Sequence, residues 1–152
     1  MIRYVHMMVP AVLEVFSKSN ENGFSVEFKG NTYPVIYPKG YWSKTPEQTR
    51  LALTENLALA TTMHLPLVFK DYKITYHSGR PLLEPYFVEN FLRDIPSCAE
   101  VDGTDTAEMV REFFDVRFSY TESEITLPSQ EPVEDAHRAI VGLSFGKDSL
   151  LT

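Results

Sequence analysis

The sequence predicts an α+β domain over residues 1–127, with two hairpins and about three helices, which leads into the first strand and helix start of an α/β nucleotide-binding domain. Alternating apolar residues around a glycine turn at 24–37 indicate a hairpin. Proline- and acid-led segments mark helix starts. Residues 128–137 contain two prolines and several acids, which is typical of a linker. An apolar stretch and a glycine turn follow within residues 138–152, where the second domain is expected to begin.

Composition narrows the class of protein. The 152 residues are 43% hydrophobic and 12% aromatic, too apolar for a disordered chain. A net charge of −7 argues against a broad surface for nucleic acid or anionic membranes. The single cysteine, Cys98, excludes an internal disulfide and indicates a packing role in a reducing compartment. No apolar run is long enough to cross a bilayer, so we expect a cytoplasmic protein without a membrane partner.

The first sixteen residues are predicted to form a strand or a short amphipathic segment of the mature protein. His6, Pro10 and Glu14 interrupt their apolar run, and no small-residue cleavage site follows, which argues against a signal peptide.

The first hairpin comes next. Pro34 lies in its second strand and lacks a backbone donor, which favours a sheet edge. The alternating residues of the hairpin that are expected to face inward are Phe24, Val26 and Phe28 before the turn at Lys29–Asn31, and Tyr33, Val35 and Tyr37 after it.

The clearest helix start is Thr45-Pro46-Glu47-Gln48, with a capping hydroxyl, a proline at the first position and a glutamine three residues after the cap. This helix is predicted from Pro46 to His64 and to end before Pro66. Its predicted buried face is Leu53, Leu57, Ala60 and His64, widened by Leu51 and Leu59.

Short elements fill the rest of the first domain. Strands are predicted at 67–69 and 73–76, and a helix at 85–93 that ends before Pro96. Asp105, with Glu108 three residues later, caps a helix that runs to about Phe114. A second hairpin is predicted from strands at 116–120 and 124–127.

Two polar clusters in this region are candidates for ligand binding. Arg80 could bind a carboxylate or phosphate, or it could pair with Glu84. His64 and His77 could approach a metal, but no third ligand stands at a diagnostic spacing, and no metal site is predicted. The acids of the linker, at 131, 134 and 135, are expected to be solvated.

The most specific signal is the terminal stretch. Ala139–Leu143 is expected to be a strand buried on both faces, Ser144-Phe145-Gly146 a turn and Lys147–Leu151 a first helical turn. Backbone N–H groups and the helix dipole make such a junction an anion site. The Walker motif is excluded, because Gly142 stands three residues before Gly146 and Asp148 occupies the hydroxyl position.

Ser144-Phe145-Gly146-Lys147-Asp148-Ser149 resembles the SGGxDS loop of the N-type ATP pyrophosphatases, which include 7-cyano-7-deazaguanine synthase and asparagine synthetase. Phe145 departs from the pattern, since the family usually has glycine there. The resemblance implies ATP and Mg²⁺ as cofactors, adenylation of a substrate with release of pyrophosphate, and displacement of AMP by a nitrogen or sulfur nucleophile. It does not identify catalytic residues.

The six loop residues would then hold the pyrophosphate of ATP. Ser144 and Ser149 would donate hydroxyl hydrogen bonds, Gly146 a backbone N–H and Lys147 a positive charge. Asp148 would orient the loop or reach the metal, or it is a simple helix-capping acid.

One strand and a helix start cannot form an adenine pocket, so the sequence predicts an N-terminal fragment that lacks the rest of its nucleotide-binding domain and is itself inactive. Its substrate would be a small molecule or a tRNA. Two alternatives stay open. One is a complete non-enzymatic binding or regulatory domain, and the other is a complete phosphate-handling enzyme that uses Arg80 and the terminal loop.

Overall fold

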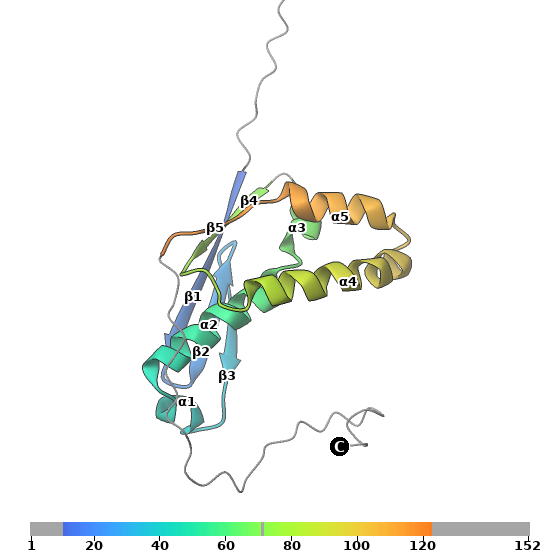
Figure 1. The fold of residues 1–152 in the computed structure, drawn as a ribbon. Helices are drawn as coiled ribbons and strands as arrows, with labels where there is room; N and C mark the ends of the chain where they lie inside the picture. Colours follow the sequence, from blue (N-terminus) through green and yellow to red (C-terminus); the bar gives the residue numbers. More distant parts are fainter. Residues whose placement is uncertain (1–10, 71, 123–152) are drawn as a thin grey trace, which may run out of the picture.

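The computed structural model of the chain describes residues 11–70 and 72–122 (Figure 1). They form an α+β fold with a five-stranded mixed sheet of order β3-β2-β1-β4-β5. The α+β prediction is confirmed for this part of the chain. The predicted linker, 128–137, and the predicted start of an α/β domain, 138–152, lie outside the described residues. The elements are β1 (Ala11–Asn20), β2 (Gly23–Phe28), β3 (Asn31–Ile36), α1 (Tyr41–Lys44), α2 (Glu47–Thr62), α3 (Leu65–Val68), β4 (Tyr72–His77), α4 (Glu84–Asp102), α5 (Thr106–Asp115) and β5 (Phe118–Tyr120).

The first three strands form an antiparallel meander. The predicted hairpin is confirmed as β2 and β3, joined by Lys29 and Gly30 with φ of 50° and 72°, the left-handed conformation that a tight two-residue hairpin turn requires. β3 lies at the edge of the sheet, as Pro34 predicted. The predicted N-terminal strand is present as β1, but it extends to Asn20 and pairs with β2, because pairing in register continues through its polar end.

The other two strands run parallel to β1. β4 pairs with β1 from Ala11↔Tyr72 to Phe16↔His77, and β5 pairs with β4. The strands predicted at 73–76 and 116–120 are therefore present, although neither forms a hairpin with another described strand. The partner predicted at 124–127 lies outside the described residues. The strand predicted at 67–69 is wrong. Those residues belong mostly to α3, because Pro66 fits the first turn of a helix.

Helix α2 covers one face of the sheet, and only part of its predicted buried face is buried. Leu59 is fully buried and Leu57 is partly buried against the core, as predicted. Leu53 is 38% exposed and Leu51 45% exposed, and His64 is also exposed. The buried residues of α2 are Ala52, Thr54, Glu55, Asn56, Ala58, Leu59 and Thr62. Thr62 Oγ1 lies 2.8 Å from the hydroxyl of Tyr76 on β4. Hydrogen bonds to the sheet and to the following loop thus decide which side of α2 is buried. The predicted cap is also wrong, since the hydroxyl of Thr45 donates to the carbonyl of Tyr41 instead.

Helices α4 and α5 lie side by side and extend away from the sheet (Figure 1). The predicted end of α4 before Pro96 is wrong. Pro96 is exposed, and the helix continues because Ile95 and Ala99 are buried in a small core against α5. The predicted cap of α5 is confirmed, since the Asp105 carboxylate accepts from the N–H of Glu108 at 2.9 Å. Cys98 is partly buried and packs against this core.

The main core lies between the sheet and its helices. Inward positions alternate with outward ones in the three neighbouring strands β2, β1 and β4, so each of these strands buries one side. The inward residues that are almost fully buried are Leu13, Val15, Phe24, Val26, Ile74 and Tyr76.

Among the described residues, no helix is both long enough and apolar enough to span a membrane.

Candidate functional site

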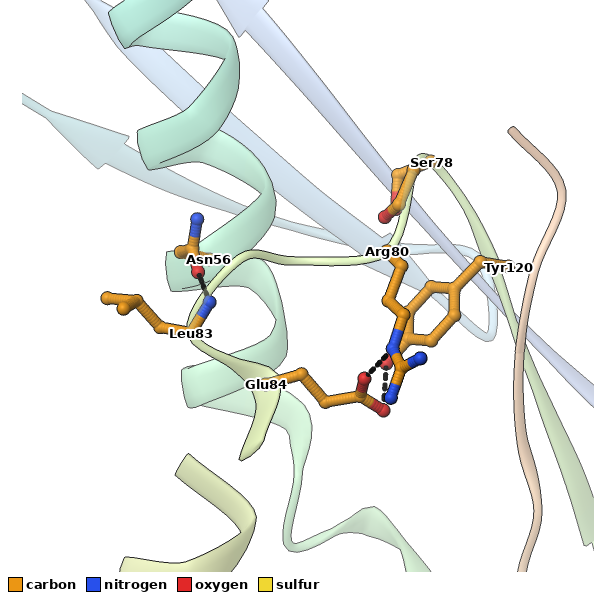
Figure 2. A network of polar contacts seen from close by, with 7 residues as sticks. Asn56, Ser78, Arg80, Leu83, Glu84 and Tyr120 are labelled. Carbon is orange, nitrogen blue, oxygen red and sulfur yellow. Dashed lines mark hydrogen bonds and ion pairs between the residues drawn. The ribbon is translucent and has the colours of Figure 1, made fainter. Parts of the chain in front are cut away.

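The loop after β4 carries the predicted polar cluster, and it lies where the parallel strands β4 and β5 end. Carboxyl ends of parallel strands are common places for ligand sites. Here the cluster is occupied by its own residues (Figure 2). Arg80 forms an ion pair with Glu84, and the hydroxyl of Tyr120 donates to the other oxygen of that carboxylate at 3.1 Å. The structure therefore confirms the pairing of Arg80 with Glu84.

Two residues of α2 hold the same loop from the other side. The carboxylate of Glu55 accepts from the N–H of Gly79 at 3.0 Å, and the amide oxygen of Asn56 accepts from the N–H of Leu83 at 2.7 Å (Figure 2). Both side chains are buried. They satisfy backbone donors that a buried loop would otherwise leave unpaired, which is costly.

Glu55 is the least satisfied member of the cluster. Its second carboxylate oxygen is buried and has no hydrogen-bond partner among the described residues. Burial raises the pKa of Glu55, the N–H of Gly79 opposes that rise, and the negative charge of Glu122 adds to it. The cluster thus holds a carboxyl group that favours its protonated form more than an exposed glutamate does.

The two tyrosines of the cluster act as hydrogen-bond partners rather than as bases. Burial raises the pKa of Tyr120, and the nearby charge of Glu84 raises it further. Burial likewise raises the pKa of Tyr76, and the hydrogen bond with Thr62 opposes the rise only in part. Both hydroxyls therefore stay protonated at neutral pH and can donate.

The histidines do not form a metal site in the described part of the chain. His77 lies 3.3 Å from the carboxylate of Glu14 and stacks on the ring of Phe16, with centroids 4.1 Å apart. His64 caps α3 at an exposed position. Among the described residues, no group of three histidine, cysteine or acidic side chains could hold a metal ion.

The predicted pyrophosphate loop, Ser144 to Ser149, and the acids at 131, 134 and 135 lie outside the described residues. Sequence reasoning missed Glu55, Asn56 and Tyr120. The run of three polar residues Thr54-Glu55-Asn56 inside an apolar helix was the available signal.

Comparison of the chain with protein-family models, with curated proteins and with solved structures gave no match.

Proposed function

We propose that the chain is the N-terminal part of an ATP-dependent adenylating enzyme. The single observation that carries this proposal is the hexapeptide Ser144–Ser149, in the order of a pyrophosphate loop and directly after the apolar stretch Ala139–Leu143.

The proposed reaction has two steps. A substrate oxygen attacks the α-phosphorus of ATP and the bond to the β-phosphate breaks, so that pyrophosphate leaves. A nitrogen or sulfur nucleophile then displaces AMP from the adenylate. Mg²⁺ would neutralise charge on the phosphates. The hydroxyls of Ser144 and Ser149 and the N–H of Gly146 donate to the pyrophosphate, where negative charge grows as the bond breaks.

The α+β domain of residues 11–122 would be an accessory part of this enzyme. In this proposal it selects the substrate, binds a partner domain or delivers the nucleophile. The ATP pocket would be completed by residues of the same protein after Thr152, and this predicts a native product about 150 residues longer or more, the size of an added domain.

The test begins with the intact mass of the native gene product, which we expect to exceed that of the 152 residues. MgATP and pyrophosphate binding by that product are then measured by calorimetry. Ser149→Ala should weaken pyrophosphate binding about tenfold through loss of a hydroxyl hydrogen bond to a charged group, and Asp148→Ala should weaken it through loss of the carboxylate that orients the loop or reaches the metal. Asp94→Ala and Ser97→Ala, at exposed positions of α4, are the matched controls.

Two results would reject the proposal. One is a native product of 152 residues without measurable MgATP binding. The other is full binding in both loop variants. Either would favour the alternative of a non-enzymatic binding or regulatory domain.

A further inference from the structure

The sheet is incomplete beside the first half of β1. Strand β1 pairs with β4 from Ala11 onward, but it pairs with β2 only from Val15↔Phe28. The β2–β3 hairpin turns at Lys29 and Gly30, so among the described residues no strand lies on that side of Ala11–Glu14. In Figure 1, β1 accordingly rises beyond the tip of the hairpin. Alternate residues of this segment therefore direct a backbone N–H and C=O toward a position that no described strand occupies.

A pocket of about 250 Å³ occupies this place, which we call the β1 notch. Residues of both sheet faces line it. Leu13, Phe28 and Tyr72 come from the helix-covered face, and Val12, Glu14 and Phe16 from the opposite face. A complete sheet would separate these two sets. The notch is smaller than the roughly 300–1,000 Å³ of pockets for drug-sized ligands, so it suits a single ring system.

Phe16 supplies a flat apolar wall to the notch. Its side chain is 41% exposed although it belongs to a central strand. His77 stacks on it with an angle of 9° between the rings and is itself hydrogen-bonded to Glu14, so the wall is fixed in orientation. An exposed aromatic ring on a central strand is a stacking surface for another planar ring.

The charges around the notch select against anions. Glu14 and Glu27 both line it, and the carboxylate of Glu27 has no hydrogen bond or ion pair within the described residues. The only cation of the lining is Lys29, whose ammonium group lies over the ring of Phe69, 3.9 Å from its centroid. A phosphate in the notch would meet two carboxylates. An uncharged ligand that donates hydrogen bonds fits better.

The backbone edge narrows the ligand class further. A strand edge offers an N–H donor and a C=O acceptor side by side, and the carboxylates add acceptors. A guanidinium group has only donors and would leave the strand N–H unpaired. A heterocycle with an exocyclic amino group next to a ring nitrogen pairs with both, because the amino group donates and the ring nitrogen accepts. A lactam such as uracil also pairs with both, but only an amino group has a second hydrogen to donate to a carboxylate of the lining.

We propose that the β1 notch is a binding site for an uncharged amino-substituted nitrogen heterocycle of the adenine or cytosine type, stacked on Phe16 and hydrogen-bonded to the edge of β1 and to Glu27. This proposal does not depend on the proposed adenylating activity. The acidic surroundings favour a nucleoside or free base over a nucleoside triphosphate.

The test is a titration of the ¹⁵N-labelled 152-residue chain with matched nucleosides, followed by amide chemical shifts. Cytidine and uridine differ at the exocyclic group, which is amino in one and oxo in the other, and in whether the adjacent ring nitrogen carries a hydrogen. Adenosine and inosine differ in the same way. Cytidine and adenosine should bind about fivefold more tightly than their partners, the effect of one hydrogen bond. The shifts should centre on residues 12–16 and 27–30. Phe16→Leu should weaken cytidine binding about tenfold through loss of stacking.

The controls separate this site from the rest of the protein. Phe114→Leu, at a 60% exposed position of α5, should leave cytidine binding unchanged. Asp148→Ala should also leave it unchanged, so that failure here and failure of the adenylating proposal are distinguishable. Equal binding of cytidine and uridine, tighter binding of N-acetyl-arginine amide, shifts that map elsewhere, or full binding in Phe16→Leu would each overturn the proposal.

Discussion

The two polar regions of this fold differ in how their groups are satisfied. At the ends of β4 and β5, Arg80, Glu84 and Tyr120 bind one another, and α2 supplies acceptors to the loop. In the β1 notch, Glu27 has no partner within the described residues and the ring of Phe16 is open to solvent. The first region resembled a ligand site in the sequence, whereas the second gave no such signal.

The comparison shows that residue type alone does not distinguish a structural polar cluster from a binding site. A partly buried arginine–glutamate–tyrosine network stabilises a loop when its groups are mutually paired. A site needs groups that remain available in the folded protein, together with a surface that a ligand can cover. Substitutions in the first region should therefore change stability, and substitutions in the second should change binding.

The largest expected effect on stability is at Asn56. Asn56→Ala removes a buried side chain whose amide oxygen accepts from the partly buried N–H of Leu83, and it should lower the free energy of unfolding by about 2 kcal/mol. Asn90→Ala is the matched control, because Asn90 also donates to the carbonyl four residues earlier but has no tertiary hydrogen bond. It should change stability by less than about 0.5 kcal/mol. Urea unfolding of both variants measures the difference, and equal effects would contradict the structural role of Asn56.

The next effect depends on pH. Burial raises the pKa of Glu55 in the folded chain above its ordinary value of 4.5. The folded state therefore holds the proton more tightly than the unfolded state, and the resulting stabilisation is complete below pH 4.5 and is lost as the pH rises through the folded pKa. Glu55→Gln keeps the acceptor for Gly79 but cannot ionise.

The stability of Glu55→Gln relative to the natural chain should thus increase as the pH is raised from about 4.5 toward 8. Urea unfolding at several pH values measures this difference. Glu100→Gln, at an exposed position of α4, should show no such trend. A difference that is independent of pH would show that Glu55 is ionised equally in the folded and unfolded states.

A smaller effect is expected at Tyr120. Tyr120→Phe keeps the ring but removes the hydroxyl that donates to Glu84, at a cost of about 1 kcal/mol in the free energy of unfolding. Tyr86→Phe, at a 61% exposed position, is the control and should be neutral. A neutral Tyr120→Phe would mean that the pair of Arg80 and Glu84 suffices to hold the loop.

Local signals in the sequence predicted much of the described fold. The alternation of Phe24, Val26 and Phe28 marked β2, and Asp105 marked the start of α5. Both features are fixed by neighbouring residues in the chain. The pairing of Arg80 with Glu84 belongs to the same class, since residues four apart adjoin at a helix start.

Tertiary contacts explain the failures. Thr54, Glu55 and Asn56 are buried because the loop after β4 needs acceptors, and apolar periodicity carries no information about that loop. Helix α4 passes Pro96 because Ile95 and Ala99 pack against α5. The β1 notch arises from the difference in length between β1 and the β2–β3 hairpin, so it becomes visible only when the strand register is known. The Ser144–Ser149 loop stays a prediction.

The smallest effects on stability are expected for substitutions in the β1 notch. They test most directly whether the notch differs from the cluster at the ends of β4 and β5. Glu27→Gln should change the free energy of unfolding by less than about 0.5 kcal/mol, because Glu27 is exposed and has no partner in the described part of the chain. Phe16→Leu should cost about 0.5–1 kcal/mol, the contribution of its stack with His77. A loss well above that range in Phe16→Leu, measured by urea unfolding, would place Phe16 among the packing residues of the fold. A near-neutral result combined with weakened cytidine binding would mean that its exposed ring serves a ligand, since a central strand gains little stability by leaving such a ring open to solvent.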